Sequence, residues 1–120
     1  TELAGASLAE AIALLVRAAI DVSRADAPLF RAVLAELPRL GGLEVFERVN
    51  RRMVDALAEW IAERRDEVEV SDPSLTAHVI VTALDGLTDH ALVFRPELLE
   101  SARFRRELER LVAGCLGVAA

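Results

Sequence analysis

Residues 75–94 are apolar around most of the circumference that they would have as a helix. At 100° per residue, a stripe of apolar side chains recurs at spacings of three and four positions, which predicts an α-helix. The stripe consists of Ala77, Ile80, Leu84, Leu87, Ala91 and Phe94, and it is widened by Val79, Ala83, Gly86, His90 and Val93. Such a helix has to be covered on two sides. A chain of 120 residues has few helices with which to cover both, so we expect another molecule to supply the second cover.

Other stretches show the one-sided pattern of amphipathic helices. Residues 6–24 and 43–67 each carry one broad apolar face, and the face of residues 6–24 includes Val22. Asp26 and Pro28 predict the start of a shorter helix that ends at Pro38. A last helix begins near Ser101 and repeats apolar side chains at heptad spacing. No alternation of apolar and polar residues is long enough to predict a β-strand, so the sequence predicts an all-α fold.

The joints between these helices carry start and stop signals. Asp72 before Pro73 predicts the start of the apolar helix, because the carboxylate can accept from free amides and proline presets the first helical φ. Arg95 and Pro96 end it, and Ser101 is the expected N-cap of the last helix. These joints are short, and composition nowhere divides the chain, so we expect a single domain.

Charge and composition exclude several functions. A net charge of -6 argues against residues 1–120 holding a phosphate backbone themselves. No apolar run approaches the roughly 20 residues of a membrane span, and no signal-peptide pattern opens the chain, so we expect a cytoplasmic protein with no membrane partner. Arg takes the place of Lys throughout, and Ala and Leu are abundant, a composition typical of a GC-rich bacterial genome.

A narrow polar band on the apolar helix is the place where chemistry could reside. It consists of His78, Thr82, Asp85 and Asp89. Two carboxylates four residues apart share a helix face, as acid–base pairs and hard-metal ligands do. The band is equally consistent with a solvated strip or with a pocket wall that fixes a polar ligand group. No second helix carries a matching set, and Cys115 is the only cysteine, so we expect no catalytic site, no metal, no cofactor and no enzyme activity.

The second half of the chain resembles a known family. The joint Asp72-Pro73, the apolar helix, the turn Pro96-Glu97-Leu98-Leu99 and the closing segment RFRRELERLV resemble the C-terminal half of tetracycline-repressor (TetR) family transcription regulators. The upstream segment APLFRAVLAEL and residues 43–67 are consistent with the ligand-binding core of that family. The resemblance implies an antiparallel bundle of five to six helices. Its last two long helices would form an intersubunit four-helix bundle in a homodimer.

The resemblance also implies that DNA binding and ligand binding belong to two different domains. Family members carry an N-terminal helix-turn-helix domain that binds DNA, and we find no basic helix pair before Ala6. We therefore expect residues 1–120 to be the ligand-binding and dimerisation domain of a repressor-like parent protein that binds DNA only through that other domain. The alternative is a free-standing helical dimeric adaptor or small-molecule carrier.

Two sets of residues follow from the resemblance. A small, mainly apolar effector of unknown identity would bind in a pocket. The predicted lining of this pocket consists of Ile12, Leu15, Phe30, Leu34, Phe46, Asn50, Met53, Leu57, Trp60, His78 and Thr82. The dimer interface would be formed by Val79, Ala83, Gly86, His90, Val93, Val112 and Leu116. Gly86 would let two backbones approach closely, although it could instead pack against a helix of its own chain. Asn50 could bond a neighbouring backbone instead of the ligand, and Trp60 and Met53 could be ordinary core residues.

Overall fold

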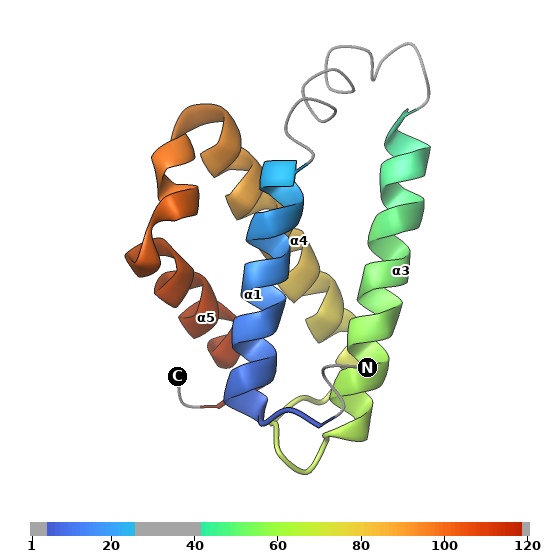
Figure 1. Ribbon diagram of the computed structural model, residues 1–120. Helices are drawn as coiled ribbons and strands as arrows, with labels where there is room; N and C mark the ends of the chain where they lie inside the picture. The colour runs from blue at the N-terminus through green and yellow to red at the C-terminus, as the bar shows by residue number, and fades with distance from the viewer. Residues whose placement is uncertain (1–4, 26–41, 119–120) are drawn as a thin grey trace.

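The computed structural model describes residues 5–25 and 42–118, and for residues 42–46 it describes the backbone alone. These residues form four α-helices and one 3-10 helix, without strands, which confirms the all-α prediction. The elements are α1 (Leu8–Ala25), α3 (Gly42–Glu63), α4 (Pro73–Phe94), η1 (Pro96–Glu100) and α5 (Ala102–Leu116) (Figure 1). The short helix expected before Pro38 lies outside the described residues, so the expected total of five to six helices stays a prediction.

Helix ends follow the capping chemistry that the sequence indicated. The Asp72 carboxylate accepts a hydrogen bond from the Leu75 amide at 3.1 Å, and Pro73 is the first residue of α4. The Ser101 hydroxyl accepts from the Phe104 amide at 3.2 Å, so both predicted N-caps are confirmed. Gly117 ends α5 with a φ of 70°, a conformation that glycine adopts without steric cost.

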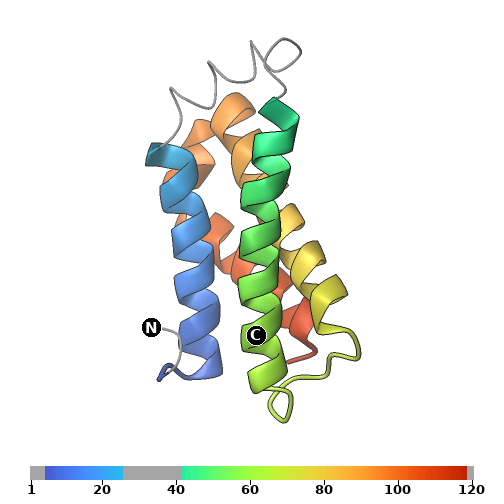
Figure 2. The same ribbon diagram turned by 90° about the vertical axis from the view of Figure 1, so that its right-hand side faces the viewer.

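Helix α4 is the element against which the others pack. α1, α3 and α5 all lie against it, whereas α1 and α3 run side by side with few close backbone approaches (Figures 1 and 2). Its buried face consists of Ala77, Ile80, Val81, Leu84, Thr88, Ala91 and Leu92. Leu87 and Phe94, which the predicted stripe placed inside, are 40% and 70% exposed. When a helix is apolar on nearly all sides, the periodicity of its sequence does not determine which side faces the core. In this structure the contacts of α4 with α1, α3 and α5 determine that side.

The face of α1 is also rotated from the prediction. Val22, expected in the core, is exposed, while Ile20 and Ser23 are buried. The Ser23 hydroxyl donates to the Thr88 hydroxyl of α4 at 2.9 Å, and Thr88 in turn donates to the Leu84 carbonyl at 2.8 Å. These bonds satisfy two buried hydroxyls that would otherwise each cost about 1 to 3 kcal/mol.

The joint between α3 and α4 is fixed by the end of α5. The Glu69 amide donates to the Leu116 carbonyl at 2.9 Å, and Val68 is buried beside it in the core. A Cβ on Gly117 would lie 2.8 Å from the Cβ of Glu69, so this crossing requires glycine for space as well as for φ. None of the helices in the described segments is long and apolar enough to cross a membrane.

Candidate functional site

A small apolar cavity lies where α1, α3, α4 and α5 meet. Its volume is ≈ 10 Å³, about the space of one water molecule. It is lined by Ala11, Ile12, Leu15, Leu57, Trp60, Ile80, Val112 and Leu116. The cavity lies between α1 and α3, which have few close backbone approaches to each other.

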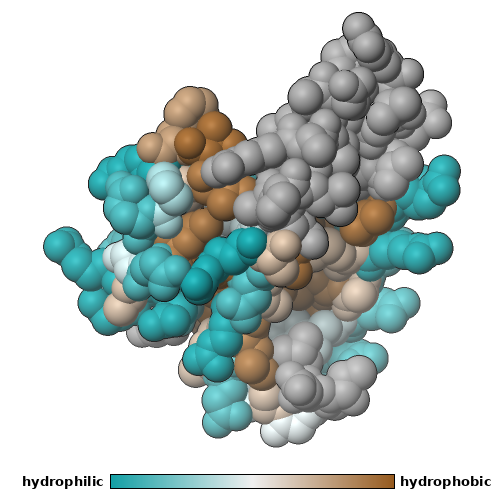
Figure 3. All heavy atoms as spheres, turned by 45° about the horizontal axis from the view of Figure 1, so that its top comes forward, coloured by the Kyte–Doolittle hydropathy of each residue, from teal (hydrophilic) through white to brown (hydrophobic). Residues whose placement is uncertain are grey.

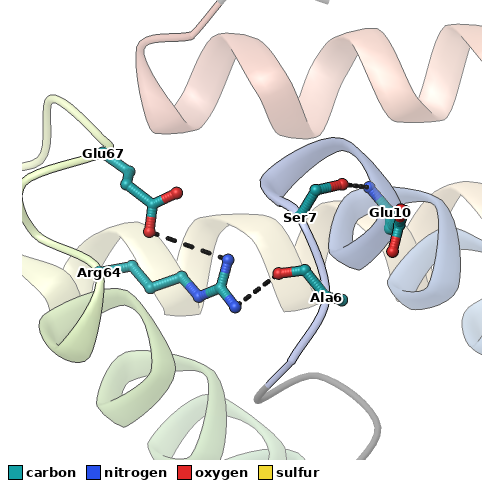
Figure 4. A network of polar contacts seen from close by, with 5 residues as sticks. All are labelled: Ala6, Ser7, Glu10, Arg64 and Glu67. Carbon is teal, nitrogen blue, oxygen red and sulfur yellow. Dashed lines mark hydrogen bonds and ion pairs between the residues drawn. The ribbon is translucent and has the colours of Figure 1, made fainter.

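Trp60 connects the cavity to a polar network at the start of α1. The guanidinium of Arg64 lies over the Trp60 ring, with Cζ 5.1 Å from the ring centroid, which is cation–π distance. The same guanidinium donates from Nη2 to the Ala6 carbonyl at 2.6 Å, and its Nη1 lies 3.8 Å from a Glu67 carboxylate oxygen (Figure 4). Arg64 therefore holds the segment that enters α1 against the end of α3.

The side of α4 that faces away from the rest of the described chain is mostly apolar, with His78 and Thr82 as exposed polar residues along its border. We call this strip the outer face; its members are Leu75, Val79, Ala83, Gly86, Leu87, His90, Val93 and Phe94. Its large aliphatic and phenyl side chains are 40% to 70% exposed, and the His90 and Phe94 rings contact each other at 4.7 Å. Apart from the neighbouring residues and backbone of α4 itself, no atom of the described residues lies within 4 Å of the position that a Cβ on Gly86 would take. Figure 3 shows hydrophobic surface gathered over the end of α4 beside η1.

Two carboxylates lie at the edge of the outer face. Burial and, to a smaller extent, the nearby charge of Asp89 together raise the pKa of Asp85 to about 6. Burial also raises the pKa of Asp89, while the Ser23 hydroxyl, which lies 3.2 Å from Asp89 Oδ1, acts in the opposite direction. Both carboxylates are half-buried, whereas His78 and Thr82 of the same band are exposed. In the part of the chain that the structure describes, no three acidic, His or Cys side chains gather as a metal site.

A family model described as "Tetracyclin repressor-like, C-terminal domain" matches residues 7–116. The chain belongs to this family. The match confirms the resemblance, which the sequence carried most clearly in its second half and which covered nearly the whole chain. Searches of curated proteins and of solved structures gave no significant match. TetR-like C-terminal domains are parts of transcription regulators, a class of protein that is not enzymatic.

In this TetR-like domain, four of the residues predicted for the effector pocket line the cavity: Ile12, Leu15, Leu57 and Trp60. Asn50 is partly buried on α3, and Met53 is 42% exposed. His78 and Thr82 are exposed and do not line the cavity. Phe30, Leu34 and the Phe46 side chain lie outside the described residues.

The other half of the cavity wall was not predicted for the effector pocket. It consists of Ala11, Ile80, Val112 and Leu116. The spacing of four between Ala11 and Leu15 and between Val112 and Leu116 puts each pair on one helix face, which was the available signal.

The residues predicted for the dimer interface divide into two groups. Val79, Ala83, Gly86, His90 and Val93 all belong to the outer face of α4. Val112 and Leu116 are each 1% exposed and lie in the core of their own chain, so their side chains have no surface to offer a second subunit. We correct the predicted set accordingly. The open space at Gly86 also disagrees with the alternative in which Gly86 packs against its own chain.

Proposed function

We propose that this TetR-like domain binds an effector and forms a homodimer within a bacterial transcription regulator. A small, mainly apolar ligand would modulate DNA binding by a separate N-terminal helix-turn-helix domain of the parent protein. The family supports the assignment to a regulator. The observation that carries the dimer is the outer face of α4, where apolar side chains surround Gly86, whose Cβ position meets no other element of the described chain.

The energetics of the outer face favour a second copy of the chain as its cover. Burying a Val, Leu or Phe side chain fully contributes about 1.5 to 3 kcal/mol, so side chains that are 40% to 70% exposed would each contribute roughly 1 kcal/mol when covered. In a two-fold dimer each such side chain counts twice. At Gly86 the missing Cβ allows the two α4 backbones to approach, which offsets the cost of a glycine inside a helix.

The cavity supports the effector half of the proposal. Its apolar walls suit an apolar ligand, and its small volume means that it would have to widen for a ligand larger than a water molecule, for example by a separation of α1 and α3. The Arg64–Ala6 contact lies just before the first residue of α1, Leu8. A displacement of α1 would therefore alter the segment through which a preceding domain connects. The ligand would act by favouring one of two arrangements, to the extent that its affinities for them differ.

The dimer is tested by Gly86→Arg, with Ala18→Arg as the matched control. Both positions are exposed on a helix, but Ala18 lies on α1, away from the outer face. Multi-angle light scattering should give the wild type and Ala18→Arg twice the 13.0 kDa mass of the chain and Gly86→Arg a monomer or an aggregate. An unchanged mass for Gly86→Arg would remove the outer face from the interface.

A free-standing dimeric adaptor or carrier would use the same interface and cavity, and the family match favours the regulator. The coding sequence directly upstream distinguishes them. A basic helix-turn-helix segment of about 50 to 80 residues in the same reading frame is expected for the regulator.

A further inference from the structure

The outer face of α4 has two edges of opposite character, with Gly86 on the line between them. At 100° per residue, Leu87 leaves the helix about 100° to one side of Gly86, and Asp85 leaves it about 100° to the other side. The Leu87 side, here called the apolar edge, also holds Ala83 and Phe94, and the two large side chains are 40% and 70% exposed. The opposite side is the polar band of His78, Thr82, Asp85 and Asp89. A cover for the outer face therefore has to match both edges at once.

A second copy of the chain matches both edges in one of the two orientations that a two-fold axis allows. When two helices face each other and run antiparallel, each edge meets the same edge of the partner, so apolar packs on apolar and polar on polar. When they run parallel, each edge meets the opposite edge. Leu87 would then lie against the partner's half-buried carboxylates, which is costly because it removes water from charged groups without pairing them. The chemistry of the two edges thus favours the antiparallel pair.

The sizes of the side chains determine where the two helices cross. Gly86 has no Cβ and permits the closest backbone approach, and residues equally far before and after it then lie opposite each other. Before Gly86 the face carries the smaller Val79 and Ala83. After it come His90 and Phe94, whose ring centroids are 4.7 Å apart. An antiparallel pair centred on Gly86 therefore places the rings of one subunit over the small side chains of the other.

We propose that the two α4 helices of the homodimer run antiparallel and cross at Gly86, with Val79 of one subunit facing Val93 of its partner. This inference rests on the proposed dimer and specifies how the second copy is seated. The large side chains of the outer face leave on the order of 500 Å² exposed per chain, so the pair would cover about 1,000 Å², near the lower limit of a specific interface. Asp85 and Asp89 of both subunits share one edge, where contact with solvent screens their repulsion.

Disulfide formation tests the arrangement in a Cys115→Ser background, which removes the cysteine that the chain already has. Val79→Cys and Val93→Cys proteins, one of them labelled with nitrogen-15, are oxidised separately and after mixing. Val79 lies seven residues before Gly86 and Val93 seven residues after it, so in the antiparallel pair two copies of either cysteine are about 21 Å apart along the helix, too far for a disulfide. One subunit of each kind instead brings the two Cα atoms within roughly 4 to 7 Å.

We expect intact-mass spectrometry to find up to about half of the subunits of the oxidised mixture in mixed dimers, the proportion given by random exchange, and less than about a tenth linked in either protein alone. Ala18→Cys, at an exposed position on α1, is the matched control and should not link to Val93→Cys. A short bis-maleimide repeats the experiment with a longer reach, which allows for a steeper crossing of the helices.

Linking of each variant to itself would mean a parallel pair and would overturn the inference while leaving the dimer intact. A dimer by light scattering that neither reagent links in the mixture would overturn the crossing at Gly86. A monomeric mass for the unoxidised proteins, the Cys115→Ser parent included, would instead contradict the homodimer of the proposed function itself.

Discussion

Replacing Asp85 with Asn should stabilise the domain at neutral pH and have little effect at pH 4. Asp85 lies half-buried on α4, and burial together with the charge of Asp89 raises its pKa from 3.8 to about 6. A carboxyl group with a raised pKa binds its proton more tightly in the folded chain than in the unfolded chain. Its contribution to stability is therefore complete below about pH 3.8, declines as the pH rises towards 6, and is constant above that.

The magnitude follows from the same pKa values. A rise from 3.8 to about 6 corresponds to roughly 3 kcal/mol against the charged form. Because Asp85 keeps contact with solvent, screening reduces this figure, and we expect about 1 to 2 kcal/mol. Asn has nearly the same shape and no charge, so Asp85→Asn should gain that amount at pH 7.5.

Urea denaturation of both proteins at equal protomer concentration, repeated from pH 4 to pH 7.5, measures the difference in unfolding free energy. Asp55→Asn, at an exposed position on α3, is the control and should change stability by less than about 0.5 kcal/mol at every pH. A difference for Asp85→Asn that does not grow with pH, or a variant less stable than the wild type at pH 7.5, would refute the electrostatic argument.

Two further predictions concern the contacts that hold the ends of helices. Gly117→Ala should lower the free energy of unfolding by about 1 to 3 kcal/mol, because a φ of 70° is strained for alanine and the new Cβ would clash with Glu69. Gly114→Ala, in open space on α5, should instead raise the free energy of unfolding by about 0.5 to 1 kcal/mol. Thermal unfolding of both variants beside the wild type measures the two differences. Arg64→Gln should weaken the bond to Ala6 and accelerate hydrogen exchange in the first turn of α1, including the Ala11 amide, while the Leu75 amide at the start of α4 exchanges at its wild-type rate. Equal acceleration at both amides would mean general destabilisation.

The sequence was informative where local chemistry determines the structure. Asp72 and Ser101 cap helices as expected, because capping depends on a side chain and amides three residues away. The outer face was also foreseeable, since an all-round apolar helix exceeds what one small chain can cover. What periodicity could not supply was the rotation of α4, so Leu87 was expected inside and Thr88 was overlooked.

The candidate site was only half predictable for a related reason. Leu57 and Trp60 follow from the apolar face of α3, but Val112 and Leu116 reach the cavity from a helix about 50 residues away. The heptad pattern of α5 gave them an apolar character without telling whether their own chain or a partner covers them. Among the described residues, Nε1 of Trp60 is a buried nitrogen without a hydrogen-bond partner; this depends on which groups surround the indole in space, and no local pattern encodes it.

Ile80 and Val79 are consecutive residues of α4, and their side chains leave the helix about 100° apart, one on the buried side and one on the exposed side. Ile80 forms part of the cavity wall, and Val79 stands on the outer face with 45% of its surface accessible. Helix α4 thus joins the proposed effector site to the proposed dimer interface at adjacent positions. Thermodynamic reciprocity then requires that an effector that tightens or loosens the dimer bind with an apparent strength that varies on dilution of the protein. Dose–response curves for such a regulator would be meaningful only at a stated number of copies per cell.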